Sequence, residues 1–93
     1  MIRHIVTLKL NENASLEAIK TKILNLKNHL PIKHIEVGFD IGFDKTASDL
    51  AIIADFENIK DLETYANDEI HQKIIKEDIK PFLISRCAVD YEV

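Results

Sequence analysis

The chain has 93 residues, a length that suits one domain with a modest core, because so short a chain buries only roughly 60 to 65% of its unfolded surface. Its 12 basic and 16 acidic residues give a net charge of −4, and no cluster of lysine and arginine stands out, which excludes a nucleic-acid-binding protein. Hydrophobic residues make up 46% of the sequence, but no apolar run approaches the ~20 residues of a membrane span, so we predict a soluble globular protein.

The single cysteine and the first residues bear on the cellular compartment. Cys87 has no second cysteine with which to form a disulfide, and no basic and apolar leader precedes the first predicted strand. We therefore expect a cytoplasmic protein. In the last strand Cys87 is expected to be a small buried hydrophobe.

The first half of the chain predicts a strand, a helix and a second strand. Residues 2–10 alternate, so that one face carries Ile2, His4, Val6, Leu8 and Leu10. Ser15 can cap a helix that Pro31 ends. Its apolar stripe follows helical spacing through Leu16, Ile19, Ile23, Leu26 and Leu30. Residues 32–43 alternate again and predict a long second strand, in which Gly38 and Gly42 indicate a bulge or bend.

The second half predicts a central strand, a broken helix and an edge strand. Residues 49–56 are apolar on both faces apart from the aspartates. Asn58 can cap a helix whose pattern is interrupted at residues 67–69 and then continues to Pro81. The closing strand alternates up to Val93.

The order of these elements is βαββαβ, the pattern of a ferredoxin-like α+β fold with a four-stranded antiparallel sheet. In that topology the strands lie in the order fourth, first, third, second, and two helices cover only one face of the sheet. Ile5, Ala51 and Ile53 would then be left on an uncovered apolar face. A homodimer that packs these faces together is the simplest way to cover them.

Several features of the whole chain resemble the stress-responsive A/B barrel family of small dimeric α+β barrels, which implies one such domain over residues 1–93. They are His4 in the opening strand, the run Asp55, Phe56, Glu57, the helical Tyr65 with His71 six residues later, and the closing run from Val89 to Glu92. Some members are polyketide cyclases that use a tyrosine and a histidine of this helical segment in an intramolecular aldol condensation.

The resemblance implies a site on three elements. Tyr65 and His71 match the catalytic positions, and His4 matches a histidine on the pocket side of the first strand. A cavity lined by Val6, Leu8, Ile52 and Ile74 would complete it. The family commonly has histidine and proline where this chain has Asp68 and Glu69, which leaves open whether His71 faces that cavity.

Each of these residues also has a structural interpretation. His71 can simply begin a helix, Tyr65 can be a core residue of an amphipathic helix, and His4 can be a core histidine with a satisfied hydrogen bond. The four histidines lie on separate elements without the spacing of a metal site, so we expect neither a metal nor another cofactor.

Three functions follow as hypotheses. The chain binds a small apolar or carbonyl-containing molecule between helices and sheet; or it is a cyclase-like lyase that uses His71 and Tyr65; or it is a non-catalytic structural or stress-related oligomer. The first two require space beside His71.

Overall fold

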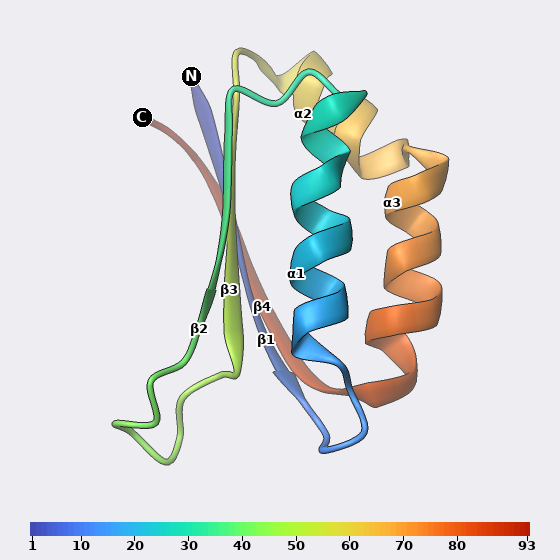
Figure 1. The fold of residues 1–93 in the computed structure, drawn as a ribbon. Coiled ribbons are helices and arrows are strands. Elements are labelled where there is room, and N and C mark those ends of the chain that lie inside the picture. Colours follow the sequence, from blue (N-terminus) through green and yellow to red (C-terminus); the bar gives the residue numbers. More distant parts are fainter.

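The computed structural model describes residues 1–93 as one four-stranded sheet with helices on one side (Figure 1). The elements in chain order are β1 (Ile2–Leu10), α1 (Leu16–Asn25), the 3-10 turn η1 (Leu26–Asn28), β2 (His34–Phe39), β3 (Leu50–Phe56), α2 (Ile59–Asn67), α3 (Glu69–Ile74), the π-helical turn η2 (Ile75–Ile79), the 3-10 turn η3 (Lys80–Phe82) and β4 (Leu83–Glu92). None of these helices is both long enough and apolar enough to span a membrane.

The sheet confirms the predicted topology. Its strand order is β2-β3-β1-β4, and all neighbouring pairs are antiparallel. Ile5 lies opposite Ile53 and Val6 opposite Ile52 in the β1–β3 register. β1 and β3 are therefore the central strands, as their apolar residues on both faces predict.

The core lies between the helices and the face of the sheet that carries Val6, Leu8 and Leu10. Its largest fully buried side chains are Tyr65, Phe56, Leu8, Ile19, Ile23 and Leu26. The alternation of β1 and the helical stripe of α1 supply most of this set, because each pattern turns one apolar face inward.

Both predicted N-caps and the predicted break in the second helix are present, whereas the first helix ends earlier than predicted. The Ser15 hydroxyl accepts from the Ala18 amide at 3.2 Å, and the Asn58 side chain accepts from the Asp61 amide at 2.9 Å. The predicted interruption at residues 67–69 is present, since α2 ends at Asn67 and α3 begins at Glu69. The first helix is shorter than predicted: α1 ends at Asn25, and the 3-10 turn η1 carries the chain to Asn28, ahead of Pro31.

The second strand is also shorter than the prediction over residues 32–43. β2 ends at Phe39, and the pairing with β3 runs through Gly38 without a bulge. Gly42 lies outside the strand with φ of 81°, a left-handed conformation that glycine adopts at no steric cost. Alternation alone misled the prediction, because Ile41 and Phe43 continue it beyond the last residue that pairs.

The face of the sheet away from the helices is open in the single chain, as predicted. Ile5, Ala51 and Ile53 are partly exposed on it. Cys87 lies opposite Thr7 and is therefore on the same face. It is exposed there, so the prediction that it is buried is wrong for the single chain.

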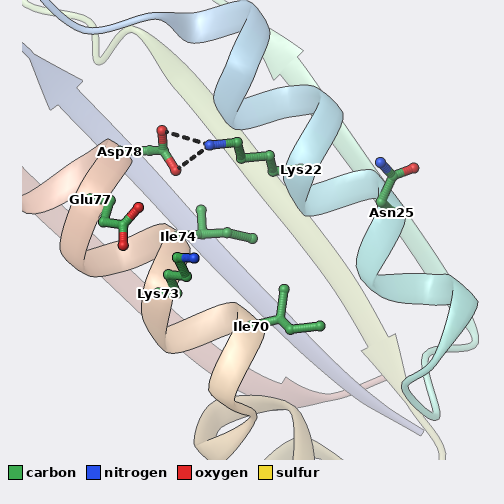
Figure 2. A pocket seen from close by; sticks show the side chains of 7 residues that line it. All are labelled: Lys22, Asn25, Ile70, Lys73, Ile74, Glu77 and Asp78. Atoms are coloured by element: carbon green, nitrogen blue, oxygen red, sulfur yellow. Dashed lines mark hydrogen bonds and ion pairs between the residues drawn. The ribbon is translucent and has the colours of Figure 1, made fainter.

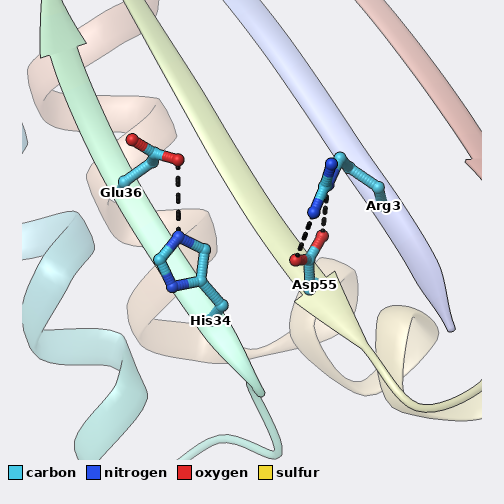
Figure 3. A network of polar contacts seen from close by, with 4 residues as sticks. All are labelled: Arg3, His34, Glu36 and Asp55. Atoms are coloured by element: carbon cyan, nitrogen blue, oxygen red, sulfur yellow. Dashed lines mark hydrogen bonds and ion pairs between the residues drawn. The ribbon is translucent and has the colours of Figure 1, made fainter. Parts of the chain in front are cut away.

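Figure 3 shows four polar residues of this face, among which Arg3 forms two bonds of 2.9 and 3.0 Å with Asp55. This contact lowers the pKa of the Asp55 carboxyl.

Candidate functional site

Three aromatic rings from three elements meet at one end of the core. The Tyr65 ring, from α2, lies 4.2 Å from the His71 ring of α3 and 5.9 Å from the His4 ring of β1, measured between centroids. The Phe56 ring of β3 packs against the tyrosine, with 5.1 Å between the two ring centroids. The structure thus brings together Tyr65, His71 and His4, the three polar residues implied by the resemblance.

The break between α2 and α3 gives His71 its position. Asp68 is the one residue between the two helices and has an extended backbone, with φ of −63° and ψ of 136°. Its carboxylate caps α3 by accepting from the His71 amide at 3.0 Å, and it also contacts Nε2 of His29 at 3.2 Å. Asp68 therefore starts the helix so that the His71 ring lies against Tyr65, and that ring does not point into solvent.

Asp90 is a fourth member of the site, which sequence reasoning missed. It lies directly opposite His4 in the β1–β4 register, and its carboxylate bonds to Nδ1 of His4. A carboxylate accepts hydrogen bonds, so Nδ1 of His4 carries the hydrogen and Nε2 is left as the acceptor in the neutral ring. The sequence predicted that the first and last strands pair in antiparallel fashion. It did not predict the register of that pairing, which brings together two residues 86 positions apart.

His71 is held in its neutral form. Burial lowers the pKa of its imidazole below the ordinary 6.5, and the positive charge of Arg86 acts in the same direction, whereas the Ala66 carbonyl and Asp68 act in the opposite direction. Its Nδ1 atom is the one buried side-chain nitrogen or oxygen that has no hydrogen-bond partner. Buried polar atoms are nearly always paired, so this nitrogen is an unusual feature of the core.

Tyr65 is the complementary group. Its side chain is 2% exposed, and burial raises the pKa of its hydroxyl to about 12, while the charge of Arg86 acts in the opposite direction. The phenol therefore stays protonated at neutral pH and is a hydrogen-bond donor. Together, a neutral imidazole and a protonated phenol can abstract a proton and stabilise the oxygen anion that results.

The apolar residues that were expected to line a cavity at the three rings do not line one. Val6, Leu8 and Ile52 are buried core residues, and Leu26, Phe56 and Tyr65 fill the space between helices and sheet. Ile74 borders a groove of about 300 Å³ between α1 and α3 (Figure 2). The Lys22–Asp78 ion pair crosses that groove, and none of His4, Tyr65 and His71 lines it.

The last strand, β4, borders the His4 end of this cluster at the edge of the sheet. Arg86, Ala88 and Asp90 lie opposite Leu8, Val6 and His4, so they share the helix-covered face of the sheet. All three are nevertheless exposed, because the helices leave this edge uncovered. Arg86, whose charge acts on both Tyr65 and His71, lies on this exposed edge.

Solved structures with the same fold are numerous, and several are described as dimers. A dimeric ferredoxin-like protein of unknown function from Thermobifida fusca is 25% identical, with a TM-score of 0.87 over 99% of this chain and 90% of that one. A dimeric protein of unknown function from Bacteroides fragilis is 28% identical, with a TM-score of 0.81 over 99% and 95% of the two chains. A hydroxynitrile lyase from Passiflora edulis is 22% identical, with a TM-score of 0.83 over 99% and 92%.

The sequence itself points to one family. No curated protein matches the chain. Residues 2–93 match the family model described as the Stress responsive A/B Barrel Domain. That match spans both central strands, the broken helix and the closing strand, so the chain belongs to the stress-responsive A/B barrel domain family.

Proposed function

We propose that this protein binds a small carbonyl compound against His4, Tyr65 and His71 and transfers a proton from the carbon beside the carbonyl. The observation that carries this proposal is the buried Nδ1 of His71, which has no hydrogen-bond partner and lies on a ring stacked against Tyr65. A buried nitrogen that is neutral and unpaired is suited to accept a proton from a substrate.

The reaction divides between the two rings. Nδ1 of His71 accepts the proton and becomes part of an imidazolium, while the electron pair of the broken C–H bond moves to the carbonyl oxygen. The Tyr65 hydroxyl, with its pKa of about 12, donates a hydrogen bond to the resulting enolate oxygen. The enolate then regains a proton from His71, or its carbon attacks a second carbonyl of the same molecule and the alkoxide formed takes the proton from His71, which is the aldol step of a cyclase.

His4 and Asp90 belong to the proposed site without taking part in that transfer. The carboxylate fixes the orientation of the His4 ring, whose Nε2 is free to accept a hydrogen bond from a hydroxyl of the ligand. One neighbour of the same fold is named as a hydroxynitrile lyase. At 22% identity that neighbour shows the shared fold, and the proposed chemistry rests on the three rings.

Exchange of hydrogen for deuterium at the carbon beside a carbonyl tests the proposal directly. Simple ketones, 2-oxo acids and 1,3-diketones are incubated with the protein in D₂O, and loss of the proton signal is followed by NMR. We expect His71→Gln and Tyr65→Phe each to slow the catalysed exchange by about 10²-fold or more. His34→Gln, which changes an exposed histidine on the opposite face, should leave it unchanged. If every compound exchanged at the rate measured in buffer alone, the proposed proton transfer would be wrong, and the hypothesis of a non-catalytic oligomer would stand.

We further propose that the chain acts as a homodimer in the cytoplasm. The open face around Ile5 and Ile53 supports the assembly, as do the neighbours described as dimers. The exposed, unpaired thiol of Cys87 fits a reducing compartment.

A further inference from the structure

Two large apolar side chains stand out from the molecule on the loop that joins β2 to β3. Ile41 is 91% exposed and Phe43 is 92% exposed, more than any other large hydrophobic residue of the chain. The loop that carries them leaves the sheet on the side away from the helices (Figure 1). It therefore projects beyond the open face, on the side where a second copy would lie.

The loop is held in shape by its own hydrogen bonds. Asp40 accepts from the Gly42 amide at 2.9 Å, and Asp44 accepts from the amide and the hydroxyl of Thr46 at 2.8 Å. At its base, the Asp49 side chain accepts from the Leu10 amide at 2.6 Å. Ile41 and Phe43 are thus presented on a pre-ordered turn, and ordering them against a partner costs less entropy than ordering a free loop.

An apolar groove of about 230 Å³ lies at the opposite edge of the open face. Its lining is Ile5, Thr7, Cys87, Ala88 and Val89, four of which are hydrophobic. Thr7 pairs with Cys87 on one side and with Ala51 on the other, and Ala51 pairs with Gly38. The groove is therefore level with Gly38, one residue before β2 ends and the chain enters the loop.

Strand order and the direction of the two-fold axis together decide which groove the loop can reach. With the order β2-β3-β1-β4, a two-fold axis that runs between two facing sheets and parallel to the strands places β2 of each copy opposite β4 of the other. Such an axis keeps the level along the strands, so each loop arrives at the groove of the second copy.

We propose that Ile41 and Phe43 form an arm that inserts into the groove beside Cys87 of a second copy of this chain, and that the exchange of two such arms fastens the dimer. This inference rests on the homodimer proposed above. It adds an occupant for the groove and a partner for the two most exposed hydrophobic side chains.

Disulfide trapping tests the contact, because Cys87 is the only cysteine. Phe43→Cys places a second thiol on the arm, and mild oxidation should give a covalent dimer linked from residue 43 to the partner's Cys87, seen by non-reducing electrophoresis and peptide mass spectrometry. Lys60→Cys, on the exposed side of α2, should give no such product. Links only between two residues 43 or two residues 87, or no link at all, would overturn the arm.

Sedimentation separates the arm from the dimer itself. We expect the double variant Ile41→Ser with Phe43→Ser to weaken dimerisation at least tenfold, while its circular dichroism stays unchanged because neither side chain belongs to the core. A monomeric unmodified protein at micromolar concentration would remove the homodimer and the arm together. A dimeric unmodified protein with an equally tight double variant would remove the arm alone.

Discussion

The charge on His71 is set by its surroundings. Its ring is packed against Tyr65, and solvent that would stabilise an imidazolium is largely excluded. Arg86 adds positive charge nearby, whereas the Ala66 carbonyl and Asp68 favour the proton. The balance lowers the pKa of His71, so the residue stays available as a base at neutral pH and over part of the acidic range.

Proton-transfer activity should therefore be constant above pH 6.5 and fall as the pH drops through the lowered pKa of folded His71. Stability follows the same direction: the contribution of His71 is complete above 6.5 and is lost below, because the unfolded chain takes up the proton first. Arg86→Gln should raise the pKa of His71 and move the acid limb to higher pH. NMR titration of the imidazole gives the value directly.

Lys20→Gln is the matched control for that charge change. Lys20 lies over the Phe39 ring, 5.0 Å from its centroid, at the β2 edge of the sheet. The loss of the Lys20 charge should leave the pKa of His71 unchanged. Equal shifts in the two variants would mean that Arg86 acts only through net charge.

At the scale of elements, Asp68 joins three segments of the chain. It ends α2, caps α3 and contacts His29 just beyond η1. Burial alone would raise the pKa of Asp68, but the hydrogen bonds from the His71 amide and from His29 lower it. The same carboxylate thus fixes the break in the helix and the position of the ring that follows.

Asp68→Ala should lower the free energy of unfolding by about 1 kcal/mol, the usual cost of losing an N-cap. Urea denaturation measures this change, and faster amide hydrogen exchange at His71 would localise it. Asp68→Asn keeps an oxygen that can cap the helix and should lose less. If the alanine variant is as stable as the unmodified protein, the cap is not what holds α3.

The order of the elements was predictable because the sequence carries their periods and caps. β1 and β3 show apolar residues on both faces, and Ser15 and Asn58 stand before helical patterns. Features set by long-range pairing were not predictable in this way. The second strand was predicted to run to Phe43, since alternation persists there, but no pairing partner extends beyond Phe39.

The site was predictable only in part, for the same reason. Tyr65 and His71 lie six residues apart, and the resemblance to the family singled them out together with His4. That Asp68 would cap α3 and still direct His71 toward Tyr65 depends on the geometry of one extended residue. Asp90 reaches His4 only through the register of strands at the two ends of the chain. The predicted lining by Val6, Leu8 and Ile52 followed the correct face of the sheet, where these side chains pack in the core.

At the scale of the whole molecule, the two faces of the sheet differ in what covers them. Helices cover one face, and the other carries Ile5, Ala51 and Ile53 without a cover. Two polar pairs of the open face are already in contact, since Arg3 forms two bonds with Asp55 and Nε2 of His34 lies 3.4 Å from Glu36 (Figure 3). A charge that already has its partner is not left uncompensated when an interface covers it.

Ile53→Asp should dissociate or unfold the dimer. The new carboxylate would lie at the centre of the buried face without a partner, at a cost on the order of several kcal/mol. Analytical ultracentrifugation measures the assembly, and circular dichroism reports whether the separated chain stays folded.

Ile59→Asp makes the same chemical change at a residue of α2 that is 61% exposed on the helix side, and it should leave the assembly intact. If both variants dissociated alike, the added negative charge would be responsible and the face would not be the interface. If neither did, a dimer would have to form through some other surface. Loss of the dimer in Ile53→Asp alone is the outcome expected from an open apolar face, because in a chain this small that surface has no other element to cover it.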